Sequence, residues 1–351
     1  MLQFLSGLVL LVGGAELSVR GAVRLAALLR VRPLIIGLTV VAFGSSAPQM
    51  AVSLQSAFSD NTDIGVGSVI GGNIFNVLVT LGLSALIIPL RVARELVRID
   101  IPLMIAASLL VYLLAWDHQL GPFEGGILLI GLLAYLLIVL RQSGYSARHG
   151  KVINDPRPRQ TGLLLIRLAA MAVGLALLIG GSHLLVDSTV LLALDLGLSE
   201  RIIGLTVIAV STSLPALVTS LIAAIRGERH IAVGNVIGSN LFNLCGVLGL
   251  TALIAPQPLS VSPNALTFDL PIMLGVAVLC LPLMLSGYRI TRAEGLLLLA
   301  LYMAYGLHLV ALSTGMALAE RLEQVVIGYV LPVLAVVIVF TMIRTWRRKT
   351  G

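Results

Sequence analysis

The chain has 351 residues, of which 58% are hydrophobic and only 11% are Asp, Glu, Lys or Arg. A soluble domain carries about 25% charged residues, so this composition excludes an ordinary globular enzyme and predicts a membrane protein. The formal net charge of +7 does not indicate nucleic-acid binding. The basic residues lie in short connections between apolar segments, where they orient a membrane protein.

Apolar segments of about 20 residues follow one another along the chain, which is the length that a helix needs to cross the hydrocarbon core of a bilayer. Strand-like alternation of apolar and polar residues is absent, so the sequence predicts an all-α, polytopic membrane protein. We expect eleven spans, near residues 2–29, 34–58, 63–89, 98–116, 122–141, 161–192, 201–225, 231–255, 265–287, 293–312 and 324–343.

A segment rich in proline and charge separates the fifth span from the sixth. Residues 142–160 include Asn154-Asp155-Pro156-Arg157, which is typical of a linker. We therefore divide the chain into a first repeat (1–141), a cytoplasmic linker (142–160), a second repeat (161–312) and an additional C-terminal helix with a basic tail (313–351).

Charge alternates between successive connections. Arginines gather in one set, which includes Arg30, Arg91 and the linker, whereas the other set holds acidic residues such as Asp60 and Asp117. By the positive-inside rule the first set is cytoplasmic, so we expect the N-terminus outside and the C-terminus inside. No targeting segment precedes the first span, and we expect a bacterial inner (plasma) membrane.

One long motif occurs twice. The segment that starts GLTVVAFGSSAPQ at Gly37 is repeated at Gly204 as GLTVIAVSTSLPA, an offset of 167 residues, with about 25 identities in about 51 ungapped pairs. Five spans precede the linker, so the second copy enters the membrane from the opposite side. Inverted-topology repeats of this kind are found in secondary transporters that bind their cargo near the bilayer midplane.

Each copy pairs a proline with hydroxyl groups in one span and amides in the next. Pro48 and Pro215 are predicted to interrupt their helices, because proline lacks an N–H and clashes with the preceding turn. Broken backbone is tolerated at membrane depth only where protein or a water-lined cavity satisfies it. Freed carbonyls, hydroxyls and amides together offer hard oxygen ligands, so we predict a cation site between the two copies.

At these motifs the chain resembles the calcium/cation antiporter superfamily, which includes sodium/calcium exchangers. The superfamily pattern is roughly Gly-Thr-Ser-x-Pro-Glu followed by Gly-Asn-x-x-Gly-Ser-Asn-x-x-Asn, and the resemblance covers both halves. It implies ten core helices and exchange of calcium for sodium or protons by alternating access, with the first and sixth helices sliding over a static core. It also implies a cation site built from the carbonyls of Ala42 and Ala209 and the side chains of Ser45, Ser46, Gln49, Asn76, Thr212, Ser213, Ser239 and Asn243.

Three departures from this pattern bear on the choice of ion. Gln49 and Ala216 stand where the superfamily has glutamate, and Gly72 stands where it has serine. Calcium prefers six to eight oxygens with carboxylates among them, so these changes weaken the prediction of calcium transport. Three hypotheses stay open: an ordinary sodium/calcium exchanger, a diverged antiporter for monovalent cations or protons, and a non-transporting protein on the same scaffold. The hydroxyls and amides kept in both copies argue against the third.

Ionisable residues also lie inside the first and sixth spans. At the repeat offset Glu16 corresponds to His183, and Arg20 to Asp187, so each helix carries opposite charges four residues apart. These are either intrahelical ion pairs or, for Glu16, His183 and Asp187, groups that couple protons to transport.

Two further acids, Asp100 and Asp269, stand near the starts of the fourth and ninth spans, and we interpret them as helix caps. No catalytic triad, metal-ligand cluster or phosphate-binding loop is recognisable, so we predict no enzyme activity, no cofactor and no nucleic-acid partner. The expected partners are the lipid bilayer and inorganic cations such as sodium or calcium. The oligomeric state is not predicted.

Overall fold

The computed structural model describes residues 2–29, 31–58, 62–149, 161–195, 209–285 and 287–313. The first half contains α1 (Leu2–Leu29), α2 (Pro33–Ile36), η1 (Gly37–Val41), α3 (Ala42–Ser45), α4 (Ala47–Ala57), α5 (Thr62–Phe75), η2 (Asn76–Leu81), α6 (Gly82–Ile87), η3 (Leu96–Asp100), α7 (Ile101–Leu114) and α8 (Pro122–His149). The second contains α9 (Thr161–Asp195), α11 (Ala209–Ile225), α12 (Arg229–Leu241), η5 (Phe242–Val247), α13 (Leu248–Ile254), η6 (Ala265–Asp269), α14 (Leu270–Leu285) and α15 (Arg292–Ser313). The η segments are π-helical turns.

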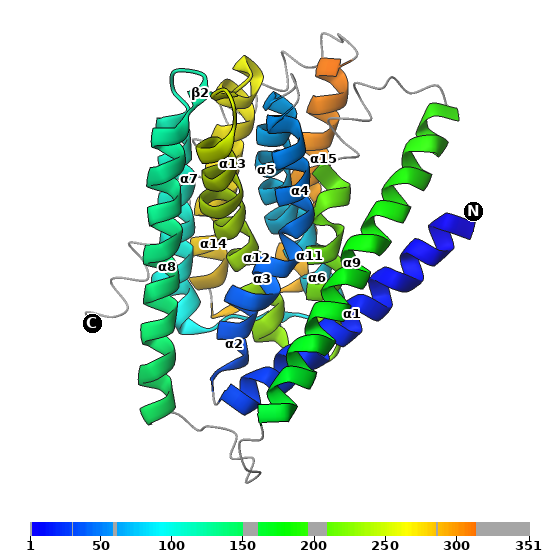
Figure 1. Cartoon of the computed structure of the whole chain (residues 1–351), viewed down its shortest axis with the longest axis vertical. Helices are drawn as coiled ribbons and strands as arrows, with labels where there is room; N and C mark the ends of the chain where they lie inside the picture. Colours follow the sequence, from blue (N-terminus) through cyan, green and yellow to red (C-terminus); the bar gives the residue numbers. More distant parts are fainter. Residues whose placement is uncertain are drawn as a thin grey trace.

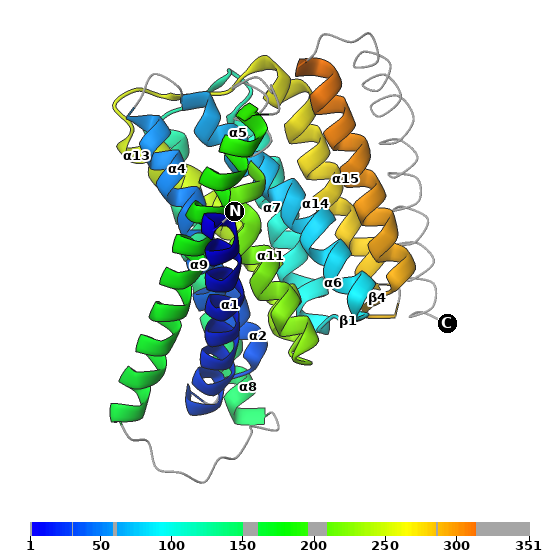
Figure 2. The same ribbon diagram turned by 90° about the vertical axis from the view of Figure 1, so that its right-hand side faces the viewer.

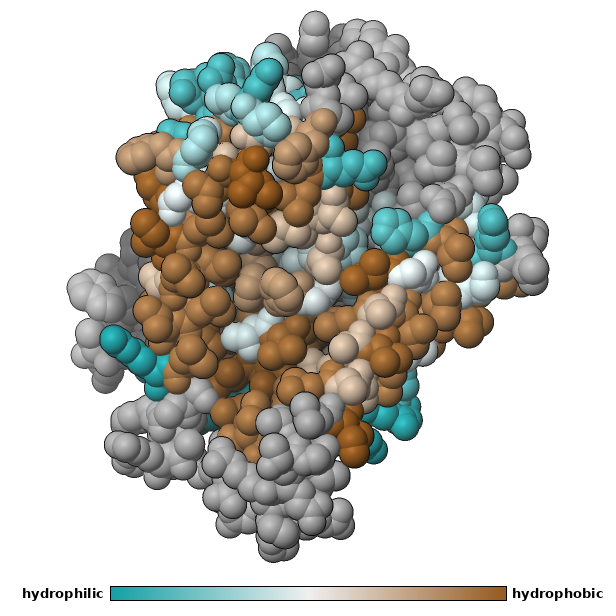
Figure 3. All heavy atoms as spheres, viewed as in Figure 1, coloured by the Kyte–Doolittle hydropathy of each residue, from teal (hydrophilic) through white to brown (hydrophobic). Residues whose placement is uncertain are grey.

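The chain is an all-α integral membrane protein, as predicted. Within the described residues, 9 helical segments are long and apolar enough to cross a membrane. Apolar side chains cover most of the face shown in Figure 3, and polar residues gather at its upper end. Large hydrophobic residues such as Phe123 and Ile130 on α8 are exposed, as expected of residues that face lipid tails.

The observed helices agree closely with most predicted spans. The first coincides with α1, whereas the fifth continues past residue 141 as α8, which ends at His149. The extension has a simple cause: residues 142–149 contain no proline, and the next helix-breaking residue is Pro156. The start of the seventh span and the whole of the span predicted at 324–343 lie outside the described residues.

Two long helices, α1 and α9, cross each other on one side of the molecule. Figure 1 shows them tilted against the other helices, and Figure 2 shows α14 and α15 on the opposite side. Glycines at the crossing let the two backbones meet. A Cβ added at Gly14 would lie 2.7 Å from the Gly174 carbonyl oxygen, and one at Gly7 would lie 2.9 Å from the Gly181 oxygen. These pairs run in opposite directions along the chain, so α1 and α9 are antiparallel.

The repeated motifs occupy the most deeply buried helices. The span Thr62–Ile87, which contains α5, is 78% buried and the span Arg229–Ile254, which contains α12, is 83% buried, whereas Pro122–Arg141 on α8 is only 22% buried. Helices that are buried on all sides in a membrane protein can carry polar side chains inward without exposing them to lipid. The fold therefore brings the amides of both copies to its centre.

The two prolines act differently on their helices. The helix of the first copy is interrupted at Ser46, between α3 and α4, as predicted. In the second copy α11 continues through Pro215, so the predicted interruption there is wrong. Pro215 cannot donate to the carbonyl of Ser211 four residues earlier, and the Ser182 hydroxyl of α9 donates to that carbonyl at 2.6 Å instead. A partner on another helix thus supports the unbroken path of α11.

Two short antiparallel ribbons, which the sequence did not reveal, join the repeats. Strand β1 (Leu90–Arg91) pairs with β4 (Arg289–Ile290), and β2 (Gln119–Leu120) pairs with β3 (Leu259–Ser260). Each ribbon connects a loop of the first repeat to a loop of the second. The strands therefore tie the two halves of the buried core together at the loops.

Candidate cation site

Four asparagines form the centre of the molecule, and they are related by the repeat offset. Asn73 Nδ2 donates to the carbonyl oxygen of Asn240 at 3.2 Å, and Asn240 Nδ2 donates to that of Asn73 at 3.3 Å. Asn76 Nδ2 donates to Asn240 Oδ1 at 3.0 Å, and Asn243 Nδ2 donates to Asn73 Oδ1 at 2.8 Å. Every bond has a counterpart in the other copy, so the two repeats meet here about a local two-fold axis.

This cluster leaves oxygen atoms free for a ligand. Among the described residues, the side-chain oxygens of Asn76, Asn243 and Ser46 are buried and have no hydrogen-bond partner. A buried acceptor without a donor costs about 1–3 kcal/mol. Hard cations take amide and hydroxyl oxygens as ligands. The side-chain oxygens of Asn76, Asn243 and Ser46 are therefore available to a ligand.

Three more oxygens converge beside the asparagines. The Ser45 hydroxyl lies 2.9 Å from the Ser239 hydroxyl and 3.1 Å from the Ala42 carbonyl oxygen, and Ser239 Oγ lies 3.5 Å from the same carbonyl. We call these three oxygens the oxygen triangle. Ligands about 2.3–2.6 Å from one cation and at right angles to each other lie about 3.3–3.7 Å apart. The triangle needs to open by only a few tenths of an ångström to become one face of a cation's coordination shell.

Asn235 of α12 holds the oxygen triangle in place. Its Oδ1 accepts from Ser45 Oγ at 3.0 Å, while its Nδ2 donates to Ser220 Oγ at 2.9 Å and to the Ala216 carbonyl oxygen at 3.2 Å. Asn235 is fully buried. Because its amide is bonded at both ends, it fixes the orientation of Ser45.

The opposite half of the site contains Gln49 and two hydroxyls of α11. Gln49 Nε2 donates to Ser213 Oγ at 3.0 Å, and Thr212 Oγ1 lies 3.5 Å from Ser68 Oγ. All four side chains are buried. No carboxylate is among the described side chains that form these contacts, and the described residues contain no group of three or more His, Cys, Asp and Glu that could hold a metal. The described part of the site is therefore built from uncharged groups.

Some of the predicted ligands contact one another directly: Ala42, Ser45 and Ser239 form the oxygen triangle, and Gln49 bonds Ser213. Nine of the ten have their contacts or burial described: Ala42, Ser45, Ser46, Gln49, Asn76, Thr212, Ser213, Ser239 and Asn243. The tenth, Ala209, is the first residue of α11, and the structure describes nothing of its side chain. The ligand list missed Asn73, Asn240 and Asn235. The signal was present for all three, since each lies three or four residues before a predicted ligand and thus on the same helix face.

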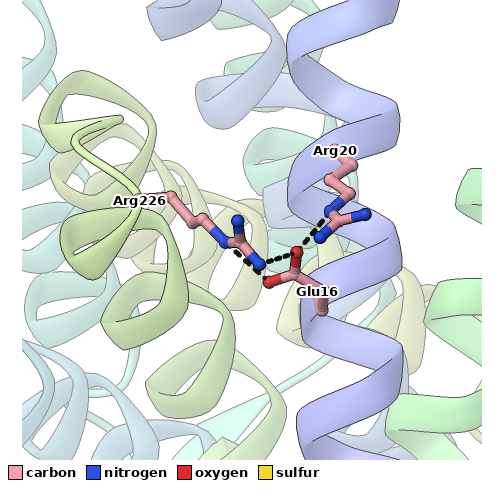
Figure 4. Close-up of polar contacts among 3 residues, drawn as sticks. All are labelled: Glu16, Arg20 and Arg226. Atoms are coloured by element: carbon pink, nitrogen blue, oxygen red, sulfur yellow. Dashed lines mark hydrogen bonds and ion pairs between the residues drawn. The ribbon is translucent and has the colours of Figure 1, made fainter.

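Glu16 forms two ion pairs, one of which links the repeats. Its carboxylate contacts Arg20 one turn along α1 and also Arg226, which directly follows α11 (Figure 4). Arg226 Nε lies 3.0 Å from Glu16 Oε2. The intrahelical pair was one of the two interpretations of Glu16, whereas the contact with Arg226 was not foreseen. The sequence offered no signal for it, because 210 residues separate the partners.

The other two proton-coupling candidates are less constrained. The side chain of His183 is exposed on α9, and the structure describes nothing of the side chain of Asp187. Whether Glu16, His183 and Asp187 couple protons is therefore still a prediction.

The interpretation of Asp100 and Asp269 as helix caps is wrong. Asp100 is fully buried and makes no capping hydrogen bond, and its neighbour is the Tyr135 hydroxyl of α8. Asp269 Oδ1 accepts from the Tyr305 hydroxyl of α15 at 2.9 Å, and its Oδ2 accepts from Asn264 at 3.2 Å. Asp269 thus joins η6 to α15, whereas both carboxylate oxygens of Asp100 are buried without a hydrogen-bond partner among the described residues.

Comparison with known proteins agrees with this architecture. The sodium/calcium exchanger protein family matches the chain over residues 1–141 and 166–311, so the chain belongs to that family. Its relatives are cation antiporters, and it is a transporter and not an enzyme.

Three individual relatives illustrate the match. The putative antiporter CaxA of Alkalimonas amylolytica is 38% identical over 307 residues, which cover 86% of this chain and 95% of that protein. The sodium/calcium exchanger MaX1 of Methanosarcina acetivorans is 30% identical, with coverage of 87% and 96%. A solved structure of the sodium-calcium exchanger NCX_Mj superposes with a TM-score of 0.74 at 29% identity and covers 89% of this chain and 97% of its own.

Proposed function

We propose that this antiporter carries monovalent cations, such as sodium, by alternating access through the neutral site between its two repeats. The observation that supports this most directly is the set of uncharged oxygens around the local two-fold axis. It comprises the oxygen triangle, the free oxygens of Asn76 and Asn243, and the hydroxyl of Ser46. Unpartnered buried oxygens and an inverted repeat are the features expected of a midplane cation site.

The absence of carboxylates from the described site favours a single positive charge. Moving an ion out of water carries an electrostatic cost that grows with the square of its charge, and ligand charge is what offsets this cost. The resemblance implies glutamates at positions 49 and 216, where this chain has Gln49 and Ala216. Attraction to dipoles grows only in proportion to the charge, so uncharged oxygens offset a larger share of the dehydration cost of a monovalent ion than of a divalent one.

Exchange of sodium for calcium is the second candidate. Its support is the similarity to MaX1 and NCX_Mj, both of which are named sodium/calcium exchangers. For this chain it requires that neutral oxygens alone hold calcium.

For the transport step, we propose that α1 and α9 move together across the rest of the protein. Their glycine-lined crossing brings backbone against backbone, which favours motion as one body. The ion pair of Glu16 with Arg226 joins this pair of helices to α11. This ion pair stabilises the conformation in which it forms, relative to conformations in which Glu16 and Arg226 are apart.

Transport into proteoliposomes tests the choice of cargo. Radioactive sodium and calcium uptake would be measured for the natural protein and for a Gln49→Glu, Ala216→Glu double variant. We expect sodium uptake by the natural protein without calcium uptake, and calcium uptake gained by the variant. Calcium uptake by the natural protein would favour the second candidate, and no flux of any cation would defeat the proposed antiport.

Proton coupling through Glu16 or Asp187 is a separate proposal. Replacing both carboxylates with amides should abolish flux that is driven by a pH gradient, while sodium binding persists. Arg24→Gln is the matched control, since it removes a charge from the same helix and leaves Glu16 with both of its arginine partners. Unchanged pH-driven flux in the double amide variant would end this proposal.

We also propose a bacterial inner membrane, with the N-terminus outside and residues 142–160 on the cytoplasmic side. The arginine-rich connections support this orientation. A single cysteine introduced into the linker should react with a membrane-impermeant reagent only from the inner side. Labelling from the outer side of intact cells would reverse the orientation.

A further inference from the structure

The two repeats differ at several site positions, among them Ser68, which corresponds to Asn235, and a pair of positions that adjoin each other in the first copy. The first copy has Gln49 and Gly72, and the corresponding residues of the second are Ala216 and Ser239. The first copy combines the long side chain of Gln49 with a glycine, whereas the second combines the short side chain of Ala216 with the hydroxyl of Ser239. The site is therefore asymmetric although its asparagines are symmetric.

In the first copy the amide of Gln49 occupies the space beside Gly72. A Cβ added at Gly72 would collide with Gln49 Nε2 and would lie 3.0 Å from Ser213 Oγ. Gln49 is 1% exposed and donates to Ser213. Glycine is thus the residue at position 72 that leaves room for this amide.

The oxygen triangle shows what the amide replaces. It consists of the Ala42 carbonyl and the hydroxyls of Ser45 and Ser239. At the repeat offset its counterpart would consist of the Ala209 carbonyl, the hydroxyl of Thr212 and a side-chain oxygen at position 72. Gly72 supplies no such oxygen, and the space next to it holds an N–H donor.

We propose that Gln49 and Gly72 together eliminate a second cation position, so that the protein binds one cation at a time on the oxygen triangle. The terminal amide of Gln49 fills this space and hydrogen-bonds to Ser213, so it occupies the place that a second cation would need. This inference rests on the proposed function as a cation antiporter. Beyond that function, it specifies how many cations bind at one time and names Gln49 and Gly72 as the residues that determine this number.

The repeat itself suggests the decisive variant. Gln49→Ala combined with Gly72→Ser gives the first copy the same pair of residues as the second. The single variants Gly72→Ser and Gln49→Ala complete a double-mutant cycle. Gly67→Ser is the matched control, because a Cβ at Gly67 on the same helix meets nothing within 4 Å.

Two readouts are needed, thermal unfolding and the sodium concentration dependence of the increase in Tm. We expect Gly72→Ser alone to lower the Tm and to weaken sodium binding by about tenfold or more, while Gly67→Ser does neither. The double variant should recover the Tm, and its Hill coefficient for sodium should rise from about 1 toward 2.

Each failure has a distinct meaning. If Gly72→Ser is as well tolerated as Gly67→Ser, the contact with Gln49 does not constrain position 72 and the inference is overturned. It is also overturned if the double variant recovers its Tm but keeps the Hill coefficient of the natural protein. Sodium binding without sodium flux in the natural protein would instead defeat the proposed antiport and leave the count of cation positions intact.

Discussion

The crossing of α1 and α9 allows one prediction to be worked out from distances. A Cβ at Gly14 would lie 2.7 Å from the Gly174 oxygen and 2.8 Å from the Leu178 nitrogen. Both are backbone atoms, so no side-chain rotation can relieve the contact. Ordinary van der Waals contact begins at 3.4 Å, so Gly14→Ala must separate the helices by about 0.7 Å.

The expected cost is that of overpacking, about 1–3 kcal/mol of unfolding free energy. The neighbouring substitution Gly13→Ala is the control, because a Cβ there meets nothing within 4 Å. Replacing glycine with alanine inside an open helix position is expected to stabilise by about 0.5–1 kcal/mol. The two adjacent substitutions should therefore shift the Tm in opposite directions.

Thermal unfolding of the purified protein in detergent measures this difference, and sodium flux in proteoliposomes measures its effect on transport. We expect Gly14→Ala to slow transport as well, because a wider crossing loosens the helices that are proposed to move together. Gly174→Ala on the facing helix should behave in the same way. Equal Tm values for Gly13→Ala and Gly14→Ala would refute the described approach of the two backbones.

Three further predictions concern single side chains. Asn243→Asp should make sodium stabilise the protein more at neutral than at acidic pH, measured by Tm with and without sodium, because the new site charge is lost on protonation. Tyr305→Phe removes the bond to Asp269 and should lower the unfolding free energy by about 1 kcal/mol, whereas no loss would make the bond unimportant. Burial raises the pKa of Glu95, but the hydrogen bond and charge of Arg32 outweigh it and lower the pKa. The pair therefore stabilises the fold above the ordinary glutamate pKa, and this stabilisation is lost as the pH falls through the lowered pKa. Glu95→Gln should remove that acid-dependent change, which is below about 1 kcal/mol because both side chains are over 40% exposed; an unchanged acid profile would contradict it.

Local sequence information was enough for the membrane fold and for much of the candidate site. Hydropathy alone gave the bounds of α1, because the length of an apolar segment is a property of consecutive residues. The offset of 167 residues identified Asn76 and Asn243 as equivalent, and the structure brings their asparagine motifs together about the local two-fold axis. An internal repeat in the sequence predicts which residues are equivalent before any contact between them is known.

The contacts that distinguish this chain depended on the tertiary structure. Gln49 meets Gly72 and Ser213, and Glu16 meets Arg226, only because of how the helices are rotated and tilted. Pro215 remains inside a continuous helix because Ser182 on another helix bonds the carbonyl that proline cannot reach. Sequence determines which groups each helix carries, whereas packing between residues that are up to 210 positions apart decides which of them touch. The repeat offset therefore showed which residues differ between the two copies, and only the tertiary structure showed that Gln49 lies against Gly72 and Ser213.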